Sequence, residues 1–274
     1  MKTPPCILTI AGSDSGGGAG IQADLKTMTV LGGFGMSVIT ALTAQNGLGV
    51  TGIHAPDAAF VALQLATVLE GFPVAAAKTG MLFSAPIIEA VARGLADRNF
   101  PLVVDPVSVS QSGHALLRED AVDALVRLML PQADLLTPNR PEAELLADMT
   151  INGVADAHEA IARILAMGPR AVLLKGGHFE GDAELVDWLG LPGQKPEALP
   201  VPRVETVNNH GTGCTLSAAI ATCLGKGATL RDAVLEAQRY LNLCLRHGYA
   251  PGKGCGPPNH AAPWMVAGGQ VVRQ

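Results

Sequence analysis

Hydrophobic and polar positions follow two alternating patterns along this chain. Short apolar runs of strand length are followed by longer segments in which apolar residues recur at helical spacing. Strands that alternate with helices in this way form βαβ units, which build a parallel sheet covered by helices. The pattern therefore predicts an α/β fold with a mainly parallel central sheet and helices on both faces.

The predicted elements are placed by their hydrophobic spacing. Strands are expected at residues 6–10, 37–42, 52–54, 74–77, 102–104, 135–136 and 171–174, and helices at 21–31, 57–69, 86–96, 120–130, 142–146, 155–167, from 213 onward, and at 230–247. Residues 190–202 are rich in Gly and Pro and are expected to form a surface loop between short strands. No change of pattern marks a boundary, so we expect a single domain over residues 1–274.

Composition and charge narrow the class of partner. Hydrophobic residues make up 48% of the 274 positions but aromatic residues only 4%, so small aliphatic side chains must fill the interior. The formal net charge of −5 argues against a nucleic-acid or anionic-membrane surface. There is no apolar stretch of about 18 residues and no signal peptide at the start. Five scattered cysteines without a C-x-x-C pair predict neither disulfides nor zinc. We expect a cytoplasmic protein that binds small molecules.

The segment Gly211-Thr212-Gly213-Cys214 precedes an apolar run of helical length. Glycines let the main chain approach a ligand closely, and the first turn of a helix leaves N–H groups without helical partners. With the positive end of the helix dipole, these donors suit a phosphate. The same field is expected to lower the pKa of the Cys214 thiol. An ordinary loop-to-helix junction with a buried cysteine is the alternative.

Residues 11–20 (AGSDSGGGAG) form a second glycine-rich segment, directly after the first predicted strand. The segment has neither the Gly-Lys-Ser/Thr ending of a P-loop nor a G-x-G-x-x-G at the spacing of a Rossmann site. It holds more glycines than a tight turn needs, so we expect a ligand-binding loop, with a simple turn as the alternative.

Polar residues follow several predicted strands, at the sheet edge where open parallel sheets bind ligands. Asp105, Asn139 and Glu142 carry oxygens that suit Mg²⁺. The structural alternatives are a turn at Asp105-Pro106 and, for Glu142, a carboxylate in the first turn of a helix, where the dipole favours negative charge. Lys175 is either a phosphate ligand or a solvated surface lysine. Together these residues favour phosphoryl transfer, with Cys214 as general base. A covalent thiol nucleophile is the competing interpretation.

Several longer segments resemble the hydroxymethylpyrimidine and phosphomethylpyrimidine kinases of thiamine biosynthesis, within the ribokinase-like superfamily. The similar stretches are residues 11–27 (AGSDSGGGAGIQADLKT), 35–46 (GMSVITALTAQN), 78–82 (KTGML), 137–145 (TPNRPEAEL), 175–178 (KGGH) and 210–218 (HGTGCTLSA). The resemblance implies a ribokinase-like three-layer sandwich. It also implies ATP- and Mg²⁺-dependent phosphorylation of 4-amino-5-hydroxymethyl-2-methylpyrimidine and then of its monophosphate, by a homodimer.

The resemblance also assigns roles to residues by position. The residues that it places around the pyrimidine are Gly12, Ala19, Asp24, Gln45, Met81 and Val107, with the Asp24 carboxylate and the Gln45 amide paired to the ring or its amino group. The resemblance places Gly211, Thr212 and Gly213 at the transferred phosphate beside Cys214, and Asn139 and Glu142 at Mg²⁺ and the phosphates. Asp105 as a Mg²⁺ ligand and Lys175 as a phosphate ligand are predicted from their positions after strands.

One departure from the family lies at residues 108–113, which read SVSQSG where relatives commonly read MVAKSG. Gln111 brings no charge, so we expect either a weaker second phosphorylation or a different cation in place of the usual lysine. The alternative enzyme is a pyridoxal or pyridoxine kinase, whose acceptor is also a hydroxymethyl group on a nitrogen heteroaromatic ring. A pyrimidine-binding protein without catalysis is the alternative from another class.

Overall fold

A computed structural model of the chain describes residues 3–107, 119–176 and 184–266. Within these residues, nine strands form one sheet in the order β3-β2-β1-β4-β5-β6-β7-β8-β9. The strands are β1 (Cys6–Asp14), β2 (Phe34–Asn46), β3 (Gly49–His54), β4 (Val74–Thr79), β5 (Leu102–Val104), β6 (Leu135–Leu136), β7 (Val172–Leu174), β8 (Glu184–Gly190) and β9 (Glu197–Pro202). The central pairs from β2 to β7 are parallel, and β3, β8 and β9 pair antiparallel with their neighbours.

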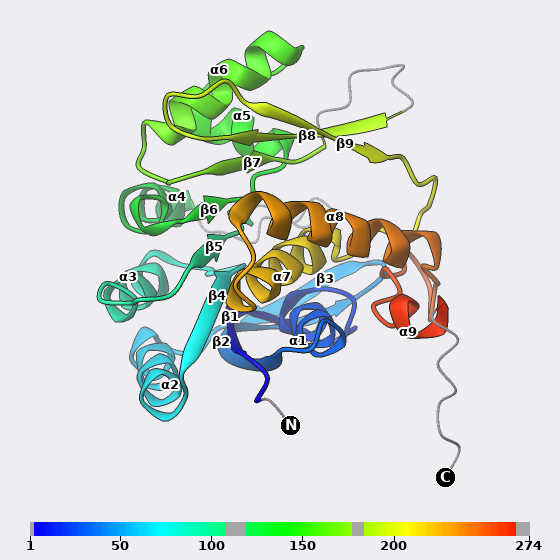
Figure 1. Ribbon diagram of the computed structural model, residues 1–274. Coiled ribbons are helices and arrows are strands. Elements are labelled where there is room, and N and C mark those ends of the chain that lie inside the picture. Colours follow the sequence, from blue (N-terminus) through cyan, green and yellow to red (C-terminus); the bar gives the residue numbers. More distant parts are fainter. Residues whose placement is uncertain (1–2, 108–118, 177–183, 267–274) are drawn as a thin grey trace.

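Helices cover both faces of this sheet (Figure 1). The first face packs against α2 (Ala58–Gly71), α3 (Ala85–Gly94), α4 (Glu119–Ala124), α5 (Arg140–Ala147) and α6 (Val154–Leu165). The second face packs against α1 (Gly20–Val30), α7 (Thr212–Gly225), α8 (Leu230–Arg246) and α9 (Ala262–Val266). The three-layer α/β architecture predicted from the alternating pattern is therefore confirmed.

The sequence of β1 is continuously apolar at its start and does not alternate between apolar and polar residues, because both faces of the strand are covered. Side chains along a strand point to opposite faces in turn. Ile7 joins the core on the α7 side, whereas Leu8 and Ile10 join the core on the α2 side, and all three have no exposed surface. Because helices cover both faces, every position of the strand except the half-buried Ser13 is buried.

Helix α7 lies deep in the protein, and its position determines where the site forms. Every residue from Thr215 to Cys223 is buried, and α7 contacts α1, α8 and the strands β1, β4 and β5. A helix that is apolar on all sides is stable only in such surroundings. Its first residues, 212–214, are half-buried and lie close to the carboxyl ends of the parallel strands, where Gly213 approaches Asp105 and Lys175.

Some predicted bounds were wrong, and proline explains two of them. Residues 190–202 were expected to form a loop, but Glu197–Pro202 is strand β9. The sheet order places β9 at an edge, where proline is tolerated. The expected helix 120–130 changes to a π-helical turn at Leu125–Met129 and a 3-10 turn at Leu130–Gln132. Pro131 lacks the N–H that would continue the helix.

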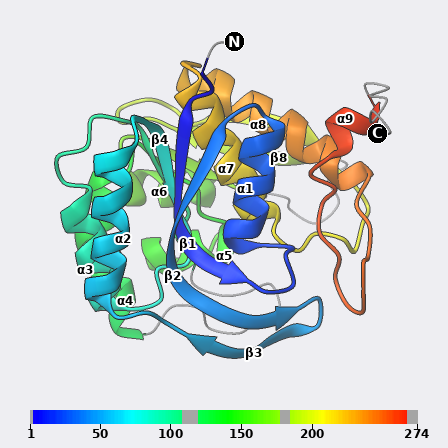
Figure 2. The ribbon, with the colours of Figure 1, turned by 90° about the horizontal axis from the view of Figure 1, so that it is seen from below.

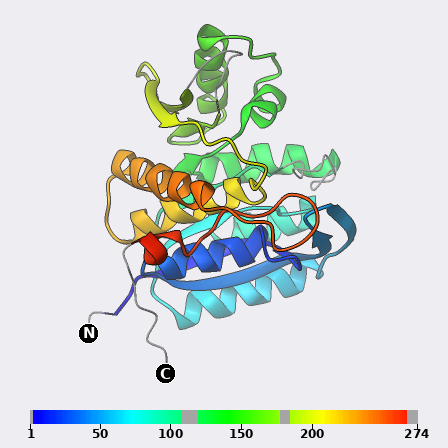
Figure 3. The same cartoon turned by 90° about the vertical axis from the view of Figure 1, so that its right-hand side faces the viewer.

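Two segments extend over the edge of the sheet at which the parallel strands have their carboxyl ends. Figure 2 shows the β2–β3 hairpin projecting beyond the other strands. The segment after α8 lies beside this hairpin and beside the loop before α7 (Figure 3), because Cys255 N–H donates to the Gly47 carbonyl oxygen and His210 N–H donates to that of Gly256. This segment was expected to be irregular, and it is so up to the short helix α9. Within the described part of the chain, none of the helices has the length and apolar character needed to cross a bilayer.

Candidate functional site

The start of α7 is held against the glycine-rich loop by a contact between two main chains. Gly211 caps the helix with φ 85°, in the left-handed region that favours glycine. A Cβ atom on Gly211 would lie 2.0 Å from the carbonyl oxygen of Gly18. The Thr212 N–H donates to the Asn209 carbonyl oxygen at 3.3 Å, so it already has a partner in the loop. The N–H groups of Gly213 and Cys214 come next in the first turn, where a helix offers no carbonyl partners.

Lys175 and Asp105 meet beside this helix start. The Lys175 ammonium lies 2.9 Å from Asp105 Oδ1, and a Cβ on Gly213 would lie 3.3 Å from Lys175 Nζ and 3.5 Å from Asp105 Oδ2. The Lys175 side chain is only 14% exposed, so it is not a solvated surface lysine. Burial by itself would lower the pKa of Lys175, but Asp105 and Glu142 hold that pKa above its usual value. The site therefore keeps a positive charge at the start of α7.

Asp105 is held in its ionised form by its neighbours. Burial would raise the pKa of this carboxyl, but the positive charges of Lys175 and Lys78 bring it below its usual value. Thr137 donates a hydrogen bond to Oδ1 at 3.2 Å. A buried carboxylate next to a lysine and a helix N-terminus can take part in binding a cation–phosphate complex.

Asn139 and Glu142 form a capping box at the start of α5. The Asn139 side chain accepts from Glu142 N–H at 2.9 Å, and the Glu142 carboxylate accepts from Asn139 N–H at 2.8 Å. Glu142 thus has a structural role at the helix start, where the sequence had indicated only a favourable interaction of its carboxylate with the helix dipole. The main chains of Asn139 and Lys175 form a β-bridge, so the predicted ATP residues lie side by side. Within the described ranges, no cluster of three or more His, Cys, Asp or Glu side chains could hold a metal ion by itself.

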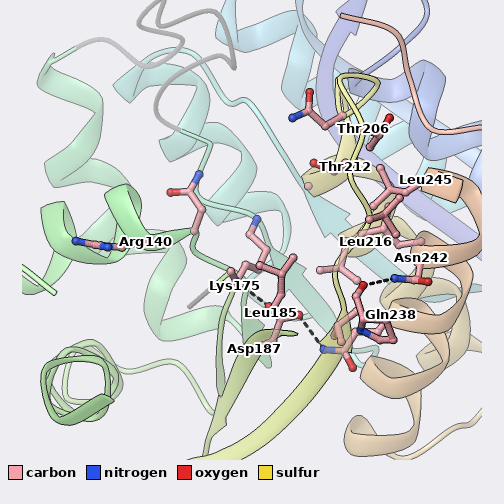
Figure 4. A pocket seen from close by; sticks show the side chains of 18 of the residues that line it. Arg140, Lys175, Leu185, Asp187, Thr206, Thr212, Leu216, Gln238, Asn242 and Leu245 are labelled. Carbon is pink, nitrogen blue, oxygen red and sulfur yellow. Dashed lines mark hydrogen bonds between the residues drawn. The ribbon is translucent and has the colours of Figure 1, made fainter. Parts of the chain in front are cut away.

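A pocket of about 1020 Å³ opens beside these residues. Asn139, Lys175 and Gly213 belong to its lining, as does Thr212. Lys175 and Arg140 lie across the pocket from Leu245 and Asn242 (Figure 4). The apolar residues of its lining include Leu185, Val201, Val204, Leu216, Leu241 and Leu245. A cavity of this size with polar groups at one side and an apolar wall suits a nucleotide.

Asp14 and His210, which the sequence reasoning missed, organise the glycine-rich loop. The Asp14 carboxylate accepts from the N–H groups of Gly16, Gly18 and Ala19 at 2.8–2.9 Å, and it lies 2.9 Å from His210 Nε2. Burial would raise the pKa of Asp14, but these hydrogen bonds and the His210 ring hold it below its usual value. The loop is thus fastened to the residue that immediately precedes Gly211. An aspartate among glycines signals such a turn, but its histidine partner lies 196 positions away.

Most residues predicted to surround the pyrimidine lie near this fastened loop. A Cβ on Gly12 would lie 3.2 Å from Met81 Sδ, so these two residues are in contact. Gln45 Nε2 lies 3.4 Å from His210 Nε2, and Ala19 directly precedes helix α1. Val107 lies two residues beyond Asp105 and donates its N–H to the Asp105 carbonyl oxygen. Gln111 and His178 lie outside the described residues.

Asp24, predicted to pair with the pyrimidine, is bound to two other side chains of the protein. The side chain is fully buried, accepts from Thr9 Oγ1 at 2.6 Å, and forms an ion pair with Lys78 at 3.2 Å. Burial would lower the pKa of Lys78, but Asp24, Cys214 and Asp105 raise it, so this buried lysine stays charged. The structure thus shows Asp24 bound to Lys78, a residue to which the sequence reasoning gave no role.

The expected lowering of the Cys214 pKa was wrong. Burial raises the pKa of the Cys214 thiol to about 11, and the negative charges of Asp24 and Asp105 add to this effect. Lys78 and the N–H of Gly20 oppose it but do not overcome it. The prediction considered only the field of the helix and left out desolvation, which disfavours the thiolate. Cys214 nevertheless keeps partial exposure.

The comparison with protein families decides the assignment. The model of the phosphomethylpyrimidine kinase family matches residues 14–259. The chain belongs to this family. It is 47% identical to a hydroxymethylpyrimidine/phosphomethylpyrimidine kinase of Streptomyces coelicolor over 94% of this chain and 95% of that protein. It is 50% identical to the thiamine biosynthesis bifunctional protein ThiED of Geobacter sulfurreducens over 93% of this chain, which spans 52% of that protein's length.

Solved structures agree with the fold. A pyridoxal kinase of Bacillus subtilis in an ADP complex has a TM-score of 0.87 and 34% identity, covering 96% of this chain and 100% of that chain. A phosphomethylpyrimidine kinase of Clostridium difficile has a TM-score of 0.76 and 41% identity, covering 86% of this chain and 97% of that chain. The ribokinase-like fold implied by the sequence resemblance is thereby confirmed for this member of the phosphomethylpyrimidine kinase family.

The main-chain contact at Gly211 generates a first prediction. Gly211→Ala should reduce kinase turnover by at least about 100-fold, because the clash with Gly18 displaces the start of α7, and should lower the free energy of unfolding by about 1–3 kcal/mol. Gly227→Ala is the matched control, since Gly227 has φ 91° but nothing within 4 Å of the Cβ position. The free energy of unfolding of Gly227→Ala should fall by about 1 kcal/mol, and its turnover should equal that of the parent. Urea unfolding and turnover assays measure both, and an equal loss of activity in the two variants contradicts the account.

Proposed function

We propose that this protein transfers the terminal phosphoryl group of ATP to 4-amino-5-hydroxymethyl-2-methylpyrimidine and then to its monophosphate, giving the diphosphate used in thiamine synthesis. The observation that carries the proposal is the start of α7. There Gly213 faces the nucleotide-sized pocket and Lys175, and the next residue, Cys214, lies close to Gly20 and Lys78. Relatives of nearly the same length bear the name of this activity.

ATP occupies the pocket beside α7 in this proposal. Its phosphates lie at Lys175, Asn139 and the N–H groups of Gly213 and Cys214, and its base lies against the apolar wall. Lys175 has the charge and the burial to neutralise phosphate oxygens in a site with little water. Phosphoryl transfer depends mainly on such positioning and charge neutralisation.

Mg²⁺ fits the donor set beside Lys175, although the described residues supply few protein ligands. Mg²⁺ prefers oxygen, and it is often held by one or two carboxylates together with water and phosphates. Asp105 is the first ligand that we propose, because its ionised carboxylate lies beside Gly213. Glu142, which is close enough to raise the Lys175 pKa, is the second. A bound Mg²⁺ would neutralise charge on the phosphates.

The acceptor lies on the Cys214 side of the same helix start. Gly12, Ala19, Gln45, Met81 and Val107 line its pocket in this proposal. Asp24 contributes through Lys78, whose charge lies close to Cys214, rather than through direct contact with the pyrimidine.

Cys214 is the residue that we propose to take the proton from the acceptor hydroxyl. Only a thiolate can accept that proton, and the pKa of about 11 leaves the thiol protonated near neutral pH. The base acts late in the transfer, when the acceptor hydroxyl loses its proton. Cys214 is therefore a base whose contribution grows with pH.

Pyridoxal or pyridoxine phosphorylation is the second candidate. Its support is structural, because pyridoxal kinases of Bacillus subtilis and Staphylococcus aureus reach TM-scores of 0.86–0.87 at 31–34% identity. The higher identity of 47% to the hydroxymethylpyrimidine kinase of Streptomyces coelicolor favours the pyrimidine.

The remaining parts of the proposal concern organisation. We propose a single kinase domain over residues 1–274, a homodimer, and a location in the cytoplasm, where ATP is available. The outer face of α2 supports a homodimer, because Phe60 and Leu63 are more than half exposed there. Apolar side chains gathered on one helix face favour contact with another protein surface.

Turnover assays test the proposed activity. The parent should consume ATP with hydroxymethylpyrimidine and form the monophosphate and then the diphosphate, with a higher kcat/KM than for pyridoxine. Cys214→Ala should lower turnover by about 100-fold or more while still binding the pyrimidine. A preference for pyridoxine would select the second candidate, and full turnover by Cys214→Ala would remove the thiol from the mechanism.

The pH dependence follows from the state of Cys214. Below the pKa of about 11 the thiolate fraction rises with pH, so kcat/KM of the parent should increase by up to about tenfold per pH unit between about pH 7 and pH 9. The residual kcat/KM of Cys214→Ala should lack this rise. A plateau of the parent's kcat/KM above about pH 7 would show a thiol that ionises lower, or a different base.

Sedimentation tests the homodimer. The parent should sediment at twice its chain mass of 28.2 kDa. Leu63→Glu, which places a charge on the exposed face of α2, should sediment as a monomer. Leu145→Glu is the control, because Leu145 is similarly exposed on α5. A parent that stays monomeric at micromolar concentration refutes this part of the proposal.

A further inference from the structure

Asp187 is a buried carboxylate in the nucleotide-sized pocket to which neither the family resemblance nor the mechanism gives a role. It lies on β8, is 7% exposed, and belongs to the pocket lining. Its Oδ1 accepts from Gly176 N–H at 2.8 Å, and its Oδ2 accepts from Gln238 Nε2 at 2.8 Å (Figure 4). Both carboxylate oxygens are therefore engaged by groups of the protein, which makes Asp187 a support rather than a ligand.

The group that Asp187 supports is the turn that carries Lys175. Lys175 N–H donates to the Pro138 carbonyl oxygen at 2.8 Å, and Gly176, with φ 66°, turns the chain away from β7. The next N–H in the chain, that of Gly176, points to Asp187. The main chain on both sides of the Lys175 Cα is thus tied down, once by the loop before α5 and once by Asp187.

Gln238 in turn holds Asp187 in place. It comes from α8, on the opposite side of the pocket from α5, and it is itself buried. Removing the Asp187 carboxylate would leave the Gly176 N–H and the Gln238 amide without this acceptor in a poorly hydrated place, where unpaired donors are unfavourable. The expected relaxation is a movement of the Lys175–Gly176 turn, which carries the ammonium away from Asp105 and from the helix start.

We propose that Asp187 is a positioning residue for ATP, which fixes the Lys175–Gly176 turn as a hydrogen-bond acceptor and is itself fixed by Gln238. This inference rests on the proposed function only in taking the pocket as the ATP site. Asp187 does not contact the reacting atoms. Its effect reaches the reaction through the place of the Lys175 ammonium.

Two substitutions at Asp187 separate the acceptor from the charge. In Asp187→Ala the Gly176 N–H loses its acceptor, and the KM for ATP should rise by about tenfold while the KM for the pyrimidine stays within about twofold. In Asp187→Asn the amide oxygen still accepts from Gly176, and a rotated Gln238 amide accepts from its N–H. The KM for ATP of that variant should stay within about twofold of the parent.

Leu189→Ala controls for a merely structural effect. Leu189 lies two positions along the same strand and is also buried, in the core beside α7 and α8, so its loss destabilises this region without touching Gly176. It should lower Tm without changing the KM for ATP. Gln238→Leu, which removes the second hydrogen bond but keeps Asp187, should raise the KM for ATP by about threefold. It also provides the test should Asp187→Ala fail to fold.

Calorimetric binding of ADP keeps this test separate from the choice of acceptor. A parent that binds ADP but does not phosphorylate the pyrimidine refutes the proposed function, and the Asp187 variants can still be compared by their Kd for ADP. Weaker ADP binding in Asp187→Ala but not in Asp187→Asn supports the positioning role. Equally weakened ADP binding in Asp187→Ala and Asp187→Asn overturns the acceptor role. A KM for ATP that is unchanged in both Asp187→Ala and Gln238→Leu also overturns it.

Discussion

The contact between the main chains of Gly18 and Gly211 is the constraint on which the rest of the site depends. It brings two loops almost 200 positions apart within van der Waals reach of each other, and no side chain fits between them. The Asp14–His210 pair strengthens the same junction from the side. As a result the helix start that we propose to bind ATP and the loop that we propose to bind the acceptor cannot move independently. A phosphoryl group can pass between them without a large rearrangement, and orientation of this kind supplies much of the catalysis of phosphoryl transfer.

Buried charges surround this junction, and each is matched by a partner. Lys175 pairs with Asp105 on the nucleotide side, and Lys78 pairs with Asp24 behind Cys214. Isolated charges at these depths would be costly, whereas paired ones remain ionised and fixed in place. The negative partners keep the two lysines charged despite their burial, whereas burial keeps the Cys214 thiol protonated. The protein therefore has a fixed cationic group that suits phosphates and, close by, a thiol whose raised pKa leaves it mostly protonated near neutral pH.

The sequence predicted the layers and the helix start well, because both depend on local patterns. Helical spacing located α7 and α8, and the glycines at 211 and 213 indicated a helix start that a ligand can approach closely. The contact of Gly211 with the main chain of Gly18 was not predicted. The partners of the charged residues could not be predicted, since His210, Lys78 and Gln238 are brought to their carboxylates only by the assembled sheet. The direction of the Cys214 pKa was wrong for a related reason: the field of a helix start is a local property, but desolvation depends on everything packed around the thiol.

The edge strand β9 likewise depends on its place in the sheet, which its own residues do not indicate. Pro200 and Pro202 indicated a loop, and only the position of β9 at the sheet edge explains why they are compatible with a strand. This edge matters for the site, because β8 carries Asp187 and the end of β9 contributes to the pocket lining. The antiparallel extension of the sheet thus provides one wall of the nucleotide pocket, which parallel βαβ units alone do not account for.

The most direct test of the account is a crystal structure with Mg²⁺, a nonhydrolysable ATP analogue and hydroxymethylpyrimidine bound together. The account predicts the terminal phosphate at hydrogen-bond distance from the N–H groups of Gly213 and Cys214, with Lys175 Nζ on its oxygens and the acceptor hydroxyl between the phosphate and Cys214 Sγ. A terminal phosphate bound away from the start of α7, or a pyrimidine on a surface that does not include Cys214, would contradict it.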